Sequence, residues 1–208
     1  MNFSTRTLVS LLVMTVGLWA HEHWLYTESP SYAIGDSIGV TLRSGHSPGN
    51  SEFLIDTQLI QTALIIRPDN TQEPIQLHAS GNEHIAYFQT MTPGTYTILV
   101  NLRKRNKGPS IYLLKTQVRV GSPELDSPLA PTQELEIMPA GSGTSFSVFA
   151  SADPVKVPLT LLAPDGSERS LIMDREGISA FTPAQAGFHV LICHFRRQTA
   201  SYSVYIEE

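Results

Sequence analysis

The sequence Thr92-Pro93-Gly94-Thr95-Tyr96-Thr97-Ile98-Leu99-Val100-Asn101-Leu102 joins a turn to a strand. The Pro-Gly pair favours the turn. Tyr96, Ile98 and Val100 then alternate along the chain, as expected for one buried face of a β-sheet. Outward from this stretch, the chain consists of short strand-like runs separated by Pro, Gly, Asn and Asp, without a long amphipathic helix. The sequence therefore predicts an all-β protein.

The turn and strand recur later in the chain. Segment 187–192, Gly-Phe-His-Val-Leu-Ile, repeats the pattern of segment 94–99 at an offset of 93 residues. Segment 159–166 repeats that of segment 63–70, a strand closed by a Pro-Asp turn, at an offset of 96 residues. Two similar offsets in the same order indicate a duplicated module.

Each module has the size of an immunoglobulin-like sandwich of about seven short strands. We expect two tandem immunoglobulin-like β-sandwich domains, at 21–120 and 132–208, joined by a proline-containing linker at 121–131. The Cys and Trp pair typical of antibody domains is missing, so the comparison concerns architecture alone. We interpret the second domain as a spacer.

Residues 1–20 have the anatomy of a secretory signal peptide. Arg6 and the starting amine form a positive region, Leu8 to Val16 an apolar region, and Ala20 offers a small residue for cleavage. The apolar run is too short to span a membrane comfortably. We therefore expect cleavage after Ala20 and export to the periplasm, with His21 as the first residue of the mature chain.

Composition narrows the function classes. Asp and Glu outnumber Lys and Arg by 19 to 14, which argues against a nucleic-acid partner because phosphate neutralisation needs a basic surface. The single cysteine, Cys193, lies in an apolar run and is expected to be a small buried hydrophobe. The nucleophile-elbow, P-loop, zinc-protease and Cys-x-x-Cys motifs are all missing from the sequence. We expect no enzymatic activity.

Cleavage after Ala20 would place a free amine beside the imidazoles of His21 and His23. A chain that begins X-Y-His can bind a metal in a plane through its amine, two deprotonated amides and the third residue's imidazole, which favours Cu(II) or Ni(II). In a second arrangement, the histidine brace, the amine and ring of His21 chelate the metal and a remote imidazole completes the site. His46, in a turn-rich loop, is the candidate for that ligand.

The other histidines are weaker candidates. His84 precedes a predicted strand and follows a glutamate. We expect structural roles for His78, His189 and His194, and the last two are five residues apart on one strand, which places them on opposite faces.

The chain resembles the exported nickel-uptake-associated family, soluble relatives of the NikM-type component of energy-coupling-factor nickel and cobalt transporters. The resemblance is carried by Ala20-His21-Glu22-His23-Trp24-Leu25, the Gly35-Asp36 turn, the Ser44-Gly45-His46 loop, and segments 93–96 and 181–187. It implies a periplasmic β-sandwich that binds Ni(II) or Co(II) through His21, His23 and His46. It also implies capture or delivery of the ion, with a membrane metal transporter as a partner.

Other functions stay open. Cu(II) is an alternative occupant because nitrogen sites bind it most tightly among the divalent first-row metals. A copper oxidase with a histidine brace would show peroxide-dependent turnover. A structural or adhesion module without metal would be indifferent to replacement of His21 and His23.

Overall fold

The computed structural model describes residues 21–103, 111–121, 131–141 and 144–207. The predicted signal peptide, most of the basic loop after Arg103 and most of the predicted linker lie outside these residues. The described residues form strands β1 to β17 and one short 3-10 helix, η1. The prediction of an all-β sandwich protein is confirmed. Among the described residues, none belongs to a helix long and apolar enough to cross a membrane.

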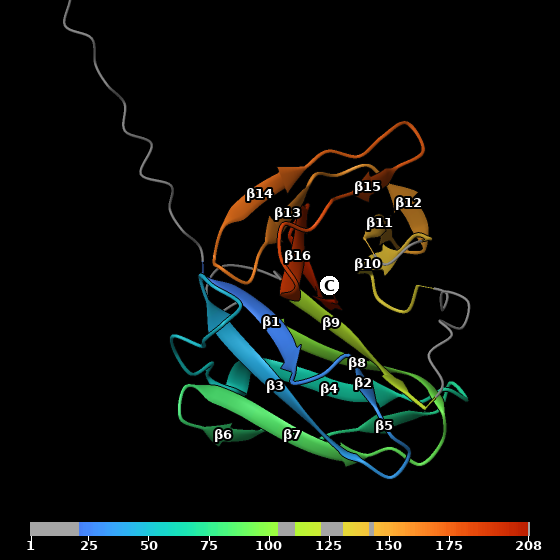
Figure 1. Cartoon of the computed structure of the whole chain (residues 1–208). Coiled ribbons are helices and arrows are strands. Elements are labelled where there is room, and N and C mark those ends of the chain that lie inside the picture. Colours follow the sequence, from blue (N-terminus) through green and yellow to red (C-terminus); the bar gives the residue numbers. More distant parts are fainter. Residues whose placement is uncertain (1–20, 104–110, 122–130, 142–143, 208) are drawn as a thin grey trace, which may run out of the picture.

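The described residues of the first half of the chain form nine strands, with η1 between β3 and β4 (Figure 1). Their bounds are β1 (Glu22–Thr27), β2 (Ser31–Tyr32), β3 (Ser37–Gly45), η1 (Thr57–Leu59), β4 (Ile60–Ile66), β5 (Gln72–Pro74), β6 (His78–Ser80), β7 (Glu83–Gln89), β8 (Gly94–Arg103) and β9 (Ile111–Val120). The second half contains β10 (Leu135–Pro139), β11 (Ser145–Ala150), β12 (Asp153–Val155), β13 (Leu159–Leu162), β14 (Glu168–Leu171), β15 (Ile178–Ala180), β16 (Gly187–Phe195) and β17 (Gln198–Ile206).

The strands form three sheets. Sheet A has the order β1-β3-β7-β6, and sheet C has the order β10-β11-β12 with β15 also paired to β11. Sheet B has nine strands in the order β14-β13-β16-β17-β9-β8-β4-β5, with β2 also paired to β9. The alternating segment that follows the Pro93-Gly94 turn forms β8, and the segment that repeats its pattern forms β16. Each therefore lies inside sheet B.

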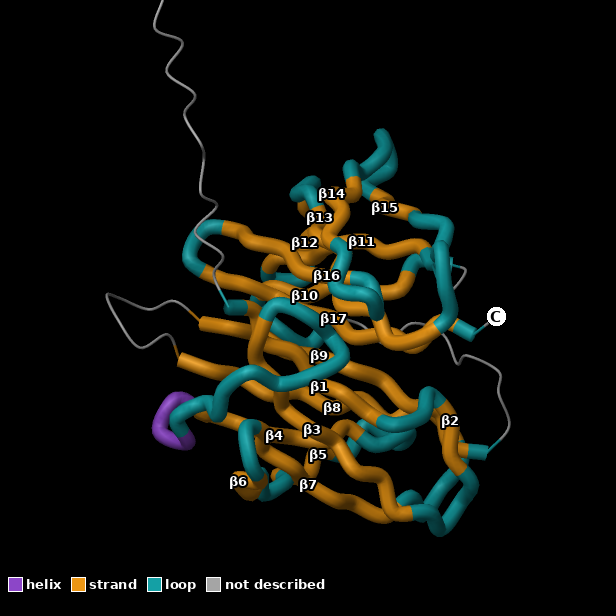
Figure 2. The backbone as a smooth tube through the Cα atoms, turned by 60° about the vertical axis from the view of Figure 1, so that its left-hand side comes forward, coloured by secondary structure: helices purple, strands orange, loops and turns teal. Residues whose placement is uncertain are grey.

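Sheet B connects the two halves of the molecule. The last strand of the first half, β9, pairs in parallel with the last strand of the second half, β17. Thr116 on β9 also donates a side-chain hydrogen bond to the carbonyl of Ser203 on β17, at 3.1 Å. The two halves expected to be separate domains therefore share one continuous sheet (Figure 2). The boundaries themselves stay a prediction.

Two hydrophobic cores lie on opposite faces of sheet B. Because side chains alternate along a strand, Leu114 of β9 lies in the core against sheet A, and its neighbour Leu113 lies in the core against sheet C. The first core includes Leu25, Ile38, Val40, Leu42, Ile65, Ile98, Val100 and Leu114. The second includes Leu113, Leu135, Ile137, Phe146, Val148, Leu161, Leu191 and Cys193. The expectation that Cys193 is a buried hydrophobe is confirmed.

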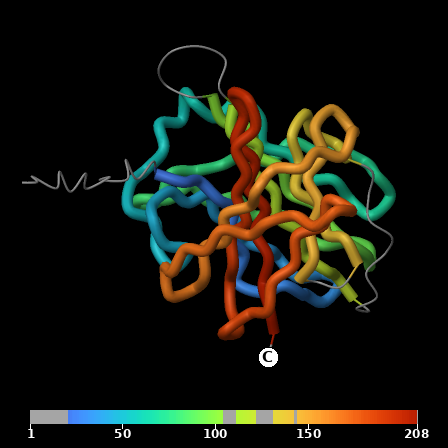
Figure 3. The backbone as a smooth tube through the Cα atoms, turned by 90° about the horizontal axis from the view of Figure 1, so that it is seen from above, coloured from blue at the N-terminus to red at the C-terminus, as the bar shows by residue number. Residues whose placement is uncertain are grey.

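Strand β1 lies between the halves. Leu25 points into the first core, whereas Trp24 is completely buried in a separate cluster with Leu162, Val190 and Ile192 of the second half. Seen from above, β16 and β17 cross the middle of the molecule beside β1 (Figure 3). Trp24 and Leu25, shortly after the predicted cleavage site, are therefore fixed by packing on both sides of β1.

A buried ion pair also connects the halves. Lys115 of β9 and Glu136 of β10 are 2% and 1% exposed, and the ammonium donates to the carboxylate. Glu136 also accepts hydrogen bonds from the backbone N–H groups of Thr132 and Gln133. Burial, the dominant influence, lowers the pKa of Lys115, and the Glu136 carboxylate opposes that shift.

Candidate metal site

The pairing of β1 with β3 sets His21 beside His46. Glu22 lies opposite Gly45 and His23 opposite Ser44 in this antiparallel ladder. One position beyond Glu22 and Gly45, His21 and His46 face each other across the strands, where side chains lie close together. Their ring centroids are 4.6 Å apart. These two residues are far apart in the sequence, and the register of the two strands brings them together.

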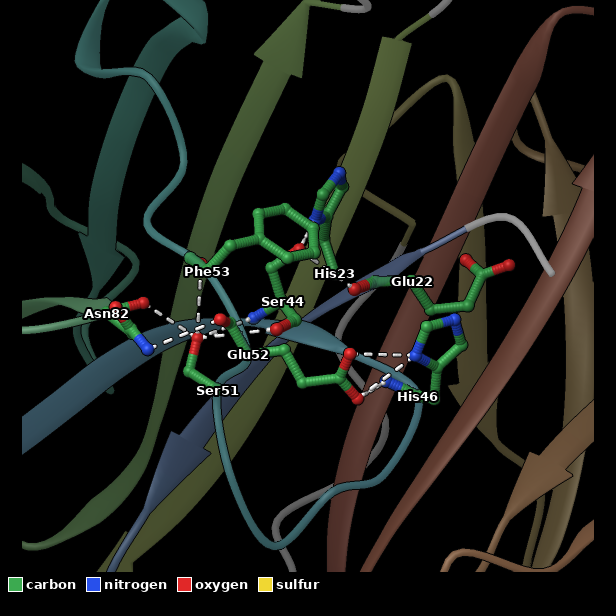
Figure 4. Close-up of polar contacts among 8 residues, drawn as sticks. All are labelled: Glu22, His23, Ser44, His46, Ser51, Glu52, Phe53 and Asn82. Carbon is green, nitrogen blue, oxygen red and sulfur yellow. Dashed lines mark hydrogen bonds and ion pairs between the residues drawn. The ribbon is translucent and has the colours of Figure 1, made fainter.

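The chain after His46 folds back to bring Glu52 to the same place. The backbone N–H of Glu52 donates to the carbonyl of Ser44 at 2.7 Å. Ser51 Oγ accepts a bond from the N–H of Ser44 at 3.1 Å and donates to the carbonyl of Asn82 at 2.7 Å. Asn82 Nδ2 donates to the carbonyl of Glu52 at 3.2 Å (Figure 4). The returning loop is thereby attached to β3 and to the turn before β7.

The carboxylate of Glu52 holds the imidazole of His46. His46 donates to it from the backbone N–H at 2.9 Å and from Nδ1 at 2.8 Å (Figure 4). A carboxylate only accepts, so Nδ1 of His46 carries the donated proton. The backbone hydrogen bond from His46, followed by its side-chain bond, lowers the pKa of Glu52. Glu52 is therefore an anion at neutral pH.

His21, His46 and Glu52 can each offer a ligand atom, and these atoms all lie within 4.8 Å of one another. His21 and Glu52 are exposed and His46 is half-buried, so an ion could enter from solvent. Glu52 could act in two ways. It could bind the metal directly, or it could orient His46, as carboxylates that accept a hydrogen bond from a metal-bound histidine do.

His23 lies apart from this cluster, although the sequence places it among the expected ligands. Its Nδ1 is 2.7 Å from Ser44 Oγ, and its ring packs edge-on against Tyr112 with centroids 4.6 Å apart. Phe53 contacts His21 at 4.6 Å and lies 6.4 Å from His23, measured between ring centroids. The structure thus brings His21 and His46 together, whereas His23 packs beside them against Ser44 and Tyr112.

The remaining histidines lie outside the cluster. His84 is buried, with Nε2 2.7 Å from the carbonyl of Ile55. His189 is buried within β16, and His194 is exposed near the end of the same strand. His78 is exposed at the start of β6.

Glu52 is the member of the cluster that sequence reasoning missed. It lies in a loop of turn-forming residues, where an acidic side chain is usual and carries no signal of its own. The one indication is its position a few residues after His46, but only the fold of the loop decides that the two side chains meet.

No protein-family model and no curated protein matches the chain. Among solved structures, it is similar to a DUF4785 family protein from Legionella pneumophila, at 13% identity and a TM-score of 0.33, over 84% of this chain and 54% of that one. It is also similar to FdeC, an Escherichia coli adhesin, at 15% identity and a TM-score of 0.28, over 90% of this chain and 64% of that one. The chain thus spans less than two thirds of either protein, and neither likeness bears on its function.

Proposed function

We propose that the mature protein binds a divalent first-row transition metal at His21, His46 and Glu52, and that it captures or delivers the ion in the periplasm. The observation that carries this proposal is the convergence of the three ligand atoms within 4.8 Å. The resemblance to the nickel-uptake-associated family favours Ni(II) or Co(II) as the physiological ion and a membrane transporter as partner. Cu(II) is the chemical competitor, because nitrogen ligands bind it more tightly.

The structure favours the cross-strand site over the planar site at His21-Glu22-His23. A planar site needs the amides of residues 22 and 23 as metal ligands, within one tight loop of chain. Here Glu22 and His23 belong to the β1–β3 ladder, and the His23 ring is held by Ser44 and Tyr112. A planar site would therefore require the start of β1 to leave β3 and lose hydrogen bonds worth about 1 kcal/mol each.

The test is metal titration of the secreted chain that begins at His21, in competition with a chromogenic chelator. We expect His46→Ala to weaken Ni(II) binding by about 100-fold and Glu52→Gln by about 10-fold to 100-fold, the range for loss of an orienting carboxylate. His78→Ala is the matched control, because His78 is an exposed strand histidine outside the cluster. Equal affinities for His46→Ala and His78→Ala would refute the proposed site.

Two further variants separate the metal geometries. His23→Ala should leave binding within about twofold for the cross-strand site but abolish a planar one, because the planar site takes its fourth nitrogen from His23. An extra residue before His21 removes the amine from either geometry. Weaker binding by that form would identify the amine as a ligand.

The copper alternative uses the same geometry. A brace needs the ring of His21 to face a second imidazole, and His46 meets that requirement at a centroid distance of 4.6 Å. Peroxide-dependent oxidation by the Cu(II)-loaded protein, lost in His46→Ala, would favour an oxidase over a delivery protein.

A further inference from the structure

A pocket adjoins the candidate metal site. It has a volume of about 320 Å³ and shares His21 with the metal cluster. Its walls include the rings of Phe53 and Tyr112, and Arg103 and Asp56 supply its charged groups. Small-molecule sites have this character: a mostly apolar, partly aromatic hollow with a few polar groups that fix orientation.

Charge favours an anionic occupant once a metal is bound. The positive charge of a divalent ion and of Arg103 together exceeds the negative charge of the Glu52 and Asp56 carboxylates. One oxygen of Asp56 already accepts a bond from the N–H of Gln58 at 3.0 Å. The Glu22 carboxylate lies 3.7 Å from His194 Nε2. Its charge also acts on Tyr112, because burial and then Glu22 raise the pKa of that phenol. Arg103 is exposed on β8, and a guanidinium binds a carboxylate through paired hydrogen bonds.

The metal cluster has room for an added donor. Its three side chains supply three ligand atoms, whereas Cu(II) and Ni(II) take at least four. At least one position is therefore left for the terminal amine or for a molecule that reaches the metal from the pocket. Because the His21 ring lines both sites, a ligand seated on Phe53 and Tyr112 lies next to the ion that His21 holds.

We infer that the pocket holds a small organic chelator with a carboxylate group, so that the protein binds the metal as a chelate of amino-acid size. The carboxylate pairs with Arg103, the apolar or aromatic part packs on Phe53 and Tyr112, and the chelator's donor atoms fill the open coordination positions. This inference rests on the proposed metal site.

The experiment is equilibrium dialysis of the secreted chain with labelled L-histidine, with and without one equivalent of Ni(II). Histamine serves as the matched probe, because it chelates through the same amine and imidazole but lacks the carboxylate. We expect one L-histidine per protein only when Ni(II) is present, held about tenfold more tightly than histamine, the strength of a hydrogen-bonded pair with a charged group.

Arg103→Gln should remove most of the preference for L-histidine over histamine. It should change the affinity for Ni(II) without chelator by no more than about twofold, because Arg103 lies outside the metal cluster. Arg175→Gln is the control, an exposed arginine in the turn before β15. As a second variant, Leu59→Trp should fill the pocket and exclude both probes while Ni(II) still binds.

The outcomes separate this inference from the proposed function. Failure of L-histidine to bind the Ni(II)-loaded protein, equal affinity for the two probes, or an L-histidine preference that survives Arg103→Gln would overturn the chelate inference and leave the metal site standing. Failure to bind Ni(II), Co(II) or Cu(II) in any form would overturn both.

Discussion

Gly45 leaves the space through which the side chain of Glu52 reaches His46. A Cβ atom at position 45 would lie 2.9 Å from Cγ and 3.0 Å from Cδ of Glu52. These distances are shorter than side chains tolerate, and the flexible Glu52 side chain is the part that can move. Gly45 thus fixes the position of a proposed ligand without touching a metal itself.

Gly45→Ala should therefore weaken metal binding about 10-fold, as other losses of an orienting carboxylate do, while all three proposed ligands stay in the chain. Metal titration measures the effect, and a thermal melt checks that the variant folds. Gly49→Ala is the control, since the nearest atom to its added Cβ would be Ser47 Oγ at 3.9 Å. Unchanged affinity in Gly45→Ala would show that the position of Glu52 is irrelevant to the site.

Trp24 should contribute strongly to stability, because it is completely buried against the second half of the chain. Trp24→Ala should lower the free energy of unfolding by about 3–5 kcal/mol, through lost burial and the cavity left behind. Trp24→Phe should cost less, since it keeps much of the apolar contact and removes a buried indole N–H for which the described residues offer no acceptor. Urea denaturation measures both, and equal losses would contradict this account.

The Lys115–Glu136 pair should show strong coupling. Lys115→Met or Glu136→Gln alone should lower the free energy of unfolding by about 3–5 kcal/mol, because each leaves a buried group without its charged partner. The double variant should cost less than the sum of the two single changes. A double-mutant cycle by urea denaturation tests this, and additive effects would show that the two groups do not interact.

His189 should make the folded state sensitive to acid. Burial lowers its pKa below the ordinary 6.5, against the opposing influences of its bond to the Gly187 carbonyl and of Asp165, while Arg169 lowers it further. Between the folded pKa and 6.5 the unfolded chain binds more protons, so the free energy of unfolding falls as pH drops through that window.

Replacement by a group that does not titrate isolates this contribution. His189→Gln should show a smaller loss of stability between pH 7 and pH 5, in urea denaturation, than the natural chain. If the free energy of unfolding of the two proteins changes equally with pH, His189 titrates alike in the folded and unfolded states. His78→Gln, a change at an exposed histidine, is the comparison.

Much of the fold follows from local patterns. The alternation of Tyr96, Ile98 and Val100 after a Pro-Gly turn predicts a half-buried strand, and these three residues lie in the first core. The repeated pattern around Gly187 predicts an equivalent strand, which is β16. Period-two alternation is a property of each strand alone, and so the sequence shows it.

These local patterns do not predict which strands pair with each other. The parallel pairing of β9 with β17 joins segments that are far apart in the chain, and no local signal distinguishes it from two separate sandwiches. Alternation shows which side chains share a face, but backbone hydrogen bonds between strands have no sequence preference strong enough to name the partner.

The sequence by itself determined that the protein is built of short strands and that His21, His23 and His46 are its candidate ligands. Only the tertiary structure decided which of them meet. The register of β1 against β3 places His21 opposite His46, and the loop returning to Ser44 adds Glu52. The ring of His23 instead packs against Tyr112 and lies 6.4 Å from Phe53 between centroids. The physical reason is that ligand geometry depends on strand pairing and loop closure, which arise from contacts across the whole sandwich.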